Sequence, residues 1–215
     1  MDDKVDKVNE YRLDVPLNEE VVRSLKVKDI IYFSGAFFTA RSLFHIRAVQ
    51  QNIIPPVPFD QINLMLHAGP VMARTETGWR AISIEPTTSM RMEKYESLVI
   101  EKLGLRAIIG KSTMGRKTLE ALKRFGCVHL SKIGIYGSVL ASKVSKVIDV
   151  HYIDELGPIE CTWVMEAKDF GPFFVDMDTH GNNFYAKIQA RARRRLEEVH
   201  RRFSIPDKLK YVSED

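Results

Sequence analysis

The chain has 215 residues, of which 45% are hydrophobic and 28% are charged. This composition is typical of a folded domain with a substantial core, and it excludes disordered, collagen-like and fibrous proteins. The formal net charge is only +4, and residues 187–203 alone hold seven Lys or Arg against two Glu. The basic character is therefore local.

Membrane-spanning and secreted proteins are also disfavoured. The uncharged stretch at residues 30–40 is far shorter than the roughly 20 apolar residues that a spanning helix needs. Residues 1–10 are charged and contain no apolar signal core, which predicts a cytoplasmic protein. Two cysteines, Cys127 and Cys161, are too few for an iron–sulfur cluster or a four-thiolate zinc site within this chain.

Residues 1–16 are predicted to be a polar N-terminal arm, followed by one folded domain at 17–203 and a tail at 204–215. Asn18 precedes two glutamates and is expected to cap a short helix. Residues 30–33 are β-branched and aromatic, which indicates a strand that ends in a turn at Ser34-Gly35. A helix is expected at residues 39–51.

Strands and helices are predicted to alternate through the remainder of the chain. Gly104 and Gly126 are each expected to end a helix, because glycine readily adopts the left-handed conformation at that position. The expected strands are 61–66, 79–84, 105–109, 128–135, 147–152, 160–166 and 172–177, and the expected helices are 92–103, 115–125, 138–146 and 184–203. This order predicts a single α/β domain with a mixed sheet and flanking helices.

Three turn segments that follow expected strands each combine small or hydroxyl residues with a cation. They contain Arg41, then Thr87, Thr88 and Arg91, and finally Lys111. Turns after the strands of an open α/β sheet gather along one edge, so the three cations are expected to converge on a small anion. Phosphate and dicarboxylate fit equally well. The alternative is that the cations are solvated and that the hydroxyl residues cap a helix.

Five other polar residues, three histidines and two aspartates, are considered as candidates for a site. His45 lies one helical turn after Arg41, where it would orient a ligand or a carboxylate, or simply be packed. His67 and His180 are expected in turns, and neither has the spacing of a metal ligand, so no metal site is predicted. Asp176 was interpreted, like Asp178, as a backbone-capping residue.

The Arg-rich segment at residues 184–203 could bind nucleic acid through phosphate contacts. It lacks the interleaved aromatic residues of single-strand binders. This favours an amphipathic helix that packs on its own domain, with its basic face solvated or in contact with an acidic subunit.

Taken together, the motifs resemble the β subunit, or C-terminal domain, of the iron–sulfur-dependent class I fumarate hydratase and L-tartrate dehydratase family. The resemblance covers residues 17–185. It rests on these segments: Ser34-Gly35 with Thr39-Ala40-Arg41 and His45; His67-Ala68-Gly69-Pro70; Pro86-Thr87-Thr88-Ser89 with Arg91-Met92; Gly110-Lys111; and Asp169-Phe170-Gly171-Pro172.

The resemblance implies a swivelling β/β/α domain that closes over an α subunit carrying a [4Fe-4S] cluster, in a higher-order oligomer. The activity it implies is reversible hydration of fumarate to (S)-malate, with L-tartrate dehydration as the alternative. Arg41, Arg91 and Lys111 would hold the substrate carboxylates and Thr87 would move the C3 proton, with His45 and Thr88 in support. The chain departs from the family pattern at three residues beside this site, namely Ser42, Glu85 and Met90.

Overall fold

The computed structural model describes residues 8–132 and 134–206. The main sheet contains β1 (Glu10–Asp14), β2 (Ile30–Thr39), β3 (Leu64–Leu66), β6 (Ala107–Gly110), β7 (Val128–Lys132), β8 (Val144–His151) and β9 (Thr162–Met177). A separate hairpin is formed by β4 (Val71–Thr75) and β5 (Gly78–Ser83).

The helices of the body, which ends at Asn183, mostly connect successive strands. They are α1 (Glu19–Ser24), α2 (Ser42–Ile46), α3 (Glu93–Leu103), α4 (Arg116–Phe125), α5 (Gly137–Ser142) and α6 (Ile153–Glu160). A π-helical turn, Arg47–Gln51, continues α2, and a 3-10 turn, Ser89–Met92, leads into α3. The helix α7 (Phe184–Arg202) belongs to a second unit that starts at Phe184.

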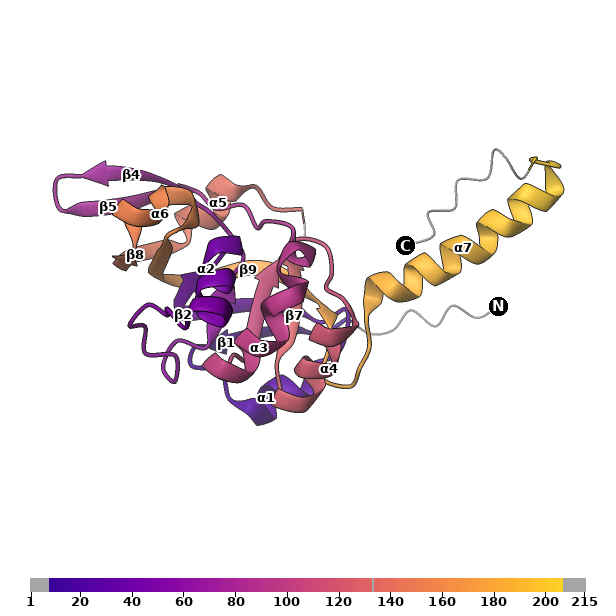
Figure 1. Cartoon of the computed structure of the whole chain (residues 1–215), viewed down its shortest axis with the longest axis horizontal. Helices are drawn as coiled ribbons and strands as arrows, with labels where there is room; N and C mark the ends of the chain where they lie inside the picture. Colours follow the sequence, from indigo (N-terminus) through magenta and orange to yellow (C-terminus); the bar gives the residue numbers. More distant parts are fainter. Residues whose placement is uncertain (1–7, 133, 207–215) are drawn as a thin grey trace. The chain divides into compact units, whose positions relative to one another are not determined.

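The main sheet closes on itself. Its order is β1-β2-β3-β6-β7-β9-β8, and β2 also pairs with β9. The strands β2, β3, β6, β7 and β9 therefore form a ring, and β1 and β8 extend it. Figure 1 shows β2, β7 and β9 within the body and the hairpin of β4 and β5 projecting from one side. The pairings of β2 with β3, β3 with β6 and β6 with β7 are parallel, so the segments that follow these strands meet at one edge.

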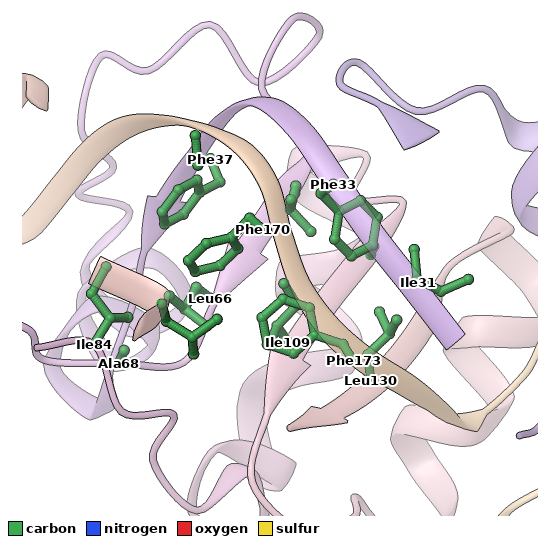
Figure 2. Packing of buried hydrophobic residues seen from close by; sticks show 14 of the residues in the cluster. Ile31, Phe33, Phe37, Leu66, Ala68, Ile84, Ile109, Leu130, Phe170 and Phe173 are labelled. Carbon is green, nitrogen blue, oxygen red and sulfur yellow. The ribbon is translucent and has the colours of Figure 1, made fainter. Parts of the chain in front are cut away.

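Alternate residues of β2, β3 and β6 belong to two hydrophobic clusters, as expected for strands with both faces covered. Phe37, Leu66 and Ile109 belong to the first cluster, in which Phe37 stacks on Phe170 with ring centroids 4.7 Å apart. Figure 2 shows these four side chains packed together between the strands. Their sequence neighbours Phe38, Met65 and Ile108 belong to the second cluster, with residues of α2, α3 and α4.

The structure confirms the predicted fold class, a mixed α/β arrangement with flanking helices. Asn18 caps α1 as expected, because its side chain accepts a hydrogen bond from the Glu20 amide. Gly104 and Gly126 both end helices in the left-handed conformation, with φ of 64° and 69°.

Two predicted breaks in the sheet were wrong. The expected turn at Ser34-Gly35 lies inside β2, which continues to Thr39 through a bulge. Gly35 has φ of 115°, and a Cβ there would lie 3.0 Å from the carbonyl oxygen of Val15. Glycine is therefore needed because the Val15 main chain passes close to the strand at this point. The strands expected at 160–166 and 172–177 are one continuous strand, β9, which bends at Gly171 with φ of 156°.

Several boundaries also differ from the predictions. The strand β4 and the helix α6 were not predicted, and the helix expected at 138–146 ends at Ser142 because β8 begins at Val144. Part of the expected arm forms β1, which pairs in parallel with β2. Residues 1–7 of the arm and 207–215 of the tail lie outside the described residues. None of the helices that the structure describes is long and apolar enough to span a membrane.

Candidate functional site

The segment from Pro86 to Ser89 is inserted between the ends of β3 and β6. The Thr87 amide donates to the carbonyl oxygen of His67 at 2.6 Å, and the Lys111 amide donates to that of Thr87 at 3.1 Å. The Ser89 amide donates in turn to the carbonyl oxygen of Lys111 at 3.2 Å. This main-chain ladder brings Thr87, Thr88 and Lys111 side by side, although they are distant in sequence.

Arg91 joins this group from the 3-10 turn Ser89–Met92. Its guanidinium donates a hydrogen bond to the hydroxyl oxygen of Thr87. Arg91 and Lys111 are exposed, whereas Thr87 and Thr88 are partly buried. The structure thus places a guanidinium against one hydroxyl and an ammonium-bearing residue beside it, an arrangement suited to an anion with several oxygens.

Arg41 reaches the same edge from the start of α2. Its Nε atom lies 3.3 Å from Oε1 of Glu160, and the two side chains are 20% and 21% exposed. A Cβ on Gly69 would lie 2.9 Å from Nη1 of Arg41, so the guanidinium lies against the turn that follows β3. Ala68 in that turn bridges to Pro86. Arg41 is therefore linked to the Thr87 segment through the turn at residues 67–70.

Six buried polar residues lie beneath this edge, and we call them the buried polar chain. They are His45, His67, Ser89, Glu96, His129 and Asp176, each with 0% relative exposure. They come from α2, α3, the ends of β3, β7 and β9, and the turn that carries Thr87. Such a set must be joined by hydrogen bonds or ion pairs, because a buried polar group without a partner is costly.

Glu96 joins the first half of the buried polar chain. Nδ1 of His45 lies 2.7 Å from the carbonyl oxygen of Arg41, and Nε2 of His45 lies 3.0 Å from Oε2 of Glu96. Nε2 of His67 approaches the same Oε2 at 3.2 Å. The ligand atoms of the three side chains all lie within 4.8 Å of one another, which is close enough for them to hold one metal ion.

Ser89 joins the second half. Its hydroxyl lies 3.0 Å from Nδ1 of His67 and 2.9 Å from Nε2 of His129. Nδ1 of His129 lies 2.7 Å from Oδ1 of Asp176. Burial holds the pKa of His67 below its ordinary value. Burial alone would raise the pKa of Glu96, but the imidazoles of His45 and His67 together hold it below its ordinary value.

The two thiols of the chain do not fit an iron–sulfur cluster. Cys127 is packed in one hydrophobic cluster and Cys161 in the other. Burial raises the pKa of Cys161 to about 11 and that of Cys127 well above its ordinary value, whereas cluster ligands are thiolates.

The segments of Arg41, Thr87 and Lys111 meet at one edge, whereas most of the buried residues beneath them were not predicted to form a site. His45 contacts a carboxylate, as one of its predicted alternatives stated, but that carboxylate belongs to Glu96, which was not singled out. Ser89 was expected to cap a helix and belongs to the resembling segment Pro86-Thr87-Thr88-Ser89, but its contact with His129 was not predicted. The partners of these residues lie on other helices and strands, so no spacing within one segment could predict the contacts.

The two aspartates differ. Asp178 caps a turn as predicted, by accepting hydrogen bonds from the His180 and Asn182 amides. Asp176 is not such a cap, because it pairs with His129 inside the protein. Of the three departures from the family pattern, Glu85 forms an ion pair with Lys132, Ser42 begins α2, and Met90 is exposed.

Comparison with known proteins gives a consistent set of relatives. A family model described as the C-terminus of fumarase matches residues 1–188. The L(+)-tartrate dehydratase subunit beta of Escherichia coli strain K12 is 36% identical over 176 residues, which are 81% of this chain and 86% of that protein. A protein of Methanocaldococcus jannaschii provisionally given the same name is 36% identical over 185 residues, 85% of this chain and 95% of that protein.

A third relative is longer than this chain. It is a protein of Geobacillus stearothermophilus provisionally named fumarate hydratase class I, 36% identical over 187 residues. The match covers 86% of this chain but only 35% of that protein. The family match ends in the first part of α7, so most of that helix lies beyond it.

Proposed function

The chain belongs to the family of fumarase C-terminal domains and tartrate dehydratase β subunits, and from this premise we propose its reaction. We propose that it is the β subunit of an iron–sulfur-dependent hydro-lyase that acts on a small 2-hydroxy dicarboxylate. The observation that carries this proposal is that the main-chain ladder joins Thr87 to Lys111 at one edge, where Arg91 donates a hydrogen bond to the Thr87 hydroxyl and Arg41 lies beside them.

Each of these residues has a chemical role in the proposal. Arg41, Arg91 and Lys111 bind the two carboxylates, because a guanidinium offers paired donors and an ammonium adds a point charge. Thr87 exchanges the proton at C3, and Arg91, which donates to its hydroxyl oxygen, stabilises the charge that develops there. His45 and Thr88 hold the neighbouring main chain in place.

The substrate is proposed from the names of the relatives. L(+)-tartrate comes first, because the relatives matched over most of their own length are named for it. Fumarate, the first substrate implied by the resemblance, is not confirmed and is retained as the second candidate because of the Geobacillus stearothermophilus relative. Both substrates present two carboxylates to the same cations.

A partner chain completes the proposed enzyme. The relatives are named as β subunits, which supports an α subunit for this chain. Since the two thiols here do not fit a cluster, the [4Fe-4S] cluster expected from the resemblance is assigned to that partner. A higher-order oligomer and a cytoplasmic location remain parts of the proposal, and no observation favours the alternative of a nucleic-acid-binding module.

Anaerobic reconstitution tests this function. The full chain is mixed with a cluster-loaded α subunit, their complex is isolated by size exclusion, and tartrate, malate and fumarate are assayed in parallel. We expect turnover of at least one substrate and none by the chain alone. A loaded complex that turns over none of the three would contradict the proposed function.

Arg91→Ala tests the assignment of the site. We expect kcat/KM to fall by roughly 10- to 100-fold, the range of a lost hydrogen bond to a charged group. Arg116→Ala is the matched control, because Arg116 is exposed on α4 and pairs with Glu120 on the same helix. Full activity of Arg91→Ala, in a complex of normal composition, would refute the role given to Arg91.

A further inference from the structure

The hydrogen bonds of the buried polar chain determine which ring nitrogen of each neutral histidine carries a hydrogen. At the Asp176 end, the carboxylate accepts a hydrogen bond from the Nδ1–H group of His129, which leaves Nε2 of a neutral His129 without a proton. That nitrogen accepts from the Ser89 hydroxyl, and Ser89 then accepts from Nδ1 of His67. In this series a neutral His67 has a bare Nε2, which faces Glu96 at 3.2 Å.

At the His45 end of the buried polar chain, the ring nitrogen that faces Glu96 also lacks a hydrogen when the histidine is neutral. The carbonyl oxygen of Arg41 can only accept, so Nδ1 of His45 carries the proton of that hydrogen bond. Nε2 of a neutral His45 is then bare and lies 3.0 Å from Oε2 of Glu96. When both histidines are neutral, two nitrogen lone pairs and one carboxylate oxygen therefore converge with no proton between them. Such an arrangement is repulsive unless a cation lies at its centre.

We propose that His45, His67 and Glu96 bind one divalent metal ion of the zinc class through two imidazole Nε2 atoms and the carboxylate. Each imidazole has its other nitrogen fixed, on the Arg41 carbonyl in one case and on the Ser89 hydroxyl in the other. This is the usual outer support of metal-bound histidine, which sets the tautomer and the orientation of the ring.

The geometry agrees with such an ion. The three sets of ligand atoms lie within 4.8 Å of one another. The rings of His45 and His67 have centroids 5.3 Å apart and an interplanar angle of 69°. Two imidazoles bound tetrahedrally to zinc at about 2.0–2.1 Å place their ring centroids about 5 Å apart. Two nitrogens and a carboxylate favour zinc and similar ions over calcium or magnesium, which prefer oxygen ligands.

Charge and coordination number point to the same ion. Glu96 and Asp176 are both fully buried carboxylates, and one divalent cation offsets their two negative charges. Oε1 of Glu96 has no hydrogen-bond partner among the described residues, so it is available as a second carboxylate ligand. Bidentate Glu96 with two imidazoles gives four ligand atoms and leaves no open position, as in structural zinc sites.

The site would connect three elements that are far apart in sequence. His45 is on α2, His67 follows β3 and Glu96 is on α3. The same side chains contact the Arg41 main chain and the turn that carries Thr87. The metal ion thus fixes the positions of the proposed substrate-binding segments, while its existence does not depend on the proposed function.

Metal content is the first test. The full chain, without a histidine tag, is refolded from denaturant with zinc or cobalt(II), desalted, and analysed by plasma mass spectrometry. We expect about one ion per chain, visible absorption typical of tetrahedral cobalt, and a rise in melting temperature over the metal-free chain. Failure to retain either metal would overturn the proposal. Nitrogen NMR that found Nε2 of His45 and of His67 protonated in the refolded protein would overturn it too, because protons would then occupy the centre.

Variants assign the ion to this cluster. His67→Gln and Glu96→Gln should each reduce zinc retention by more than about tenfold. His180→Gln, in an exposed turn, is the matched control and should retain the ion. If either buried variant fails to fold, the cobalt spectrum of the wild-type chain decides, because imidazole and carboxylate ligands lack the intense charge-transfer band of thiolate ligands. Equal zinc retention by all variants, or a thiolate band, would place the metal elsewhere and refute the assignment.

Discussion

Two groups of polar residues share the segment from Pro86 to Ser89, but they differ in exposure. Thr87 contacts the exposed Arg91, whereas Ser89, two residues later, is fully buried between His67 and His129. The exposed group keeps charge available to a ligand, whereas the polar atoms of the buried group face one another and, in our proposal, a metal ion offsets their charge. Neighbouring residues of this segment therefore have different tasks: the exposed ones face a ligand, and the buried ones hold the segment in place. Substitutions in the two groups should accordingly have different effects.

The largest effect is expected in the buried group. Glu96→Ala leaves two buried imidazoles without their shared carboxylate, and we expect the free energy of unfolding to fall by about 3–5 kcal/mol. Urea unfolding followed by circular dichroism measures this. Glu120→Ala, at an exposed glutamate of α4, should change stability by less than about 1 kcal/mol. A comparable loss in both variants would abolish the distinction between the two groups.

The two buried cysteines, Cys127 and Cys161, should react slowly with thiol reagents in the native chain. Burial raises the pKa of Cys161 from 9.0 to about 11, so in mildly alkaline solution its thiolate population should be about 100-fold lower than that of an ordinary thiol. Cys127 should also be unreactive, since burial raises its pKa well above the ordinary value of a thiol. We expect Ellman's reagent to modify both only after denaturation. Rapid labelling of the native chain would show that the interior is open.

Lys111 tests the exposed group. Lys111→Ala should reduce kcat/KM of the reconstituted enzyme by roughly tenfold or more, because one charged contact to a carboxylate is lost. Stability should stay within about 0.5 kcal/mol, since the side chain is exposed. Lys117→Ala on α4 is the matched control. A loss of stability without a change in kinetics would mean that Lys111 belongs with the structural residues.

The smallest effect is expected at Glu85, which forms an exposed ion pair with Lys132. Exposed pairs contribute about 0–1 kcal/mol, so Glu85→Gln should leave the unfolding midpoint almost unchanged. Removal of one negative charge near the site should lower KM for a dianion no more than about fivefold, and added salt should reduce the difference. A rise in KM would indicate that Glu85 helps to bind the substrate.

Local chemistry explains what could be predicted from the sequence. Asn18 and Gly126 act within one turn of a helix, so their roles follow from the neighbouring residues. The gathering of the Arg41 and Lys111 segments could be predicted because consecutive parallel strands bring their ends to one edge. The roles of individual site residues stay predictions until activity is measured.

Non-local packing explains what could not be predicted. Gly171 and Pro172 have the sequence of a break, yet pairing with β2 keeps β9 continuous across them. Likewise, nothing beside Glu96 in the sequence indicates that two histidines from other elements share its carboxylate. These partners are between 29 and 51 positions away, beyond the range of helix and strand periodicity.

The long strand β9 has a consequence for how the protein is made. Ile30 pairs with Phe174, and β9 also supplies partners to β7 and β8. Contacts of such large sequence separation form slowly and only once both segments exist. During translation the strands β2 and β7 therefore lack β9 as a partner until nearly the whole body has left the ribosome. Chaperone binding to the nascent chain would be most useful in that interval.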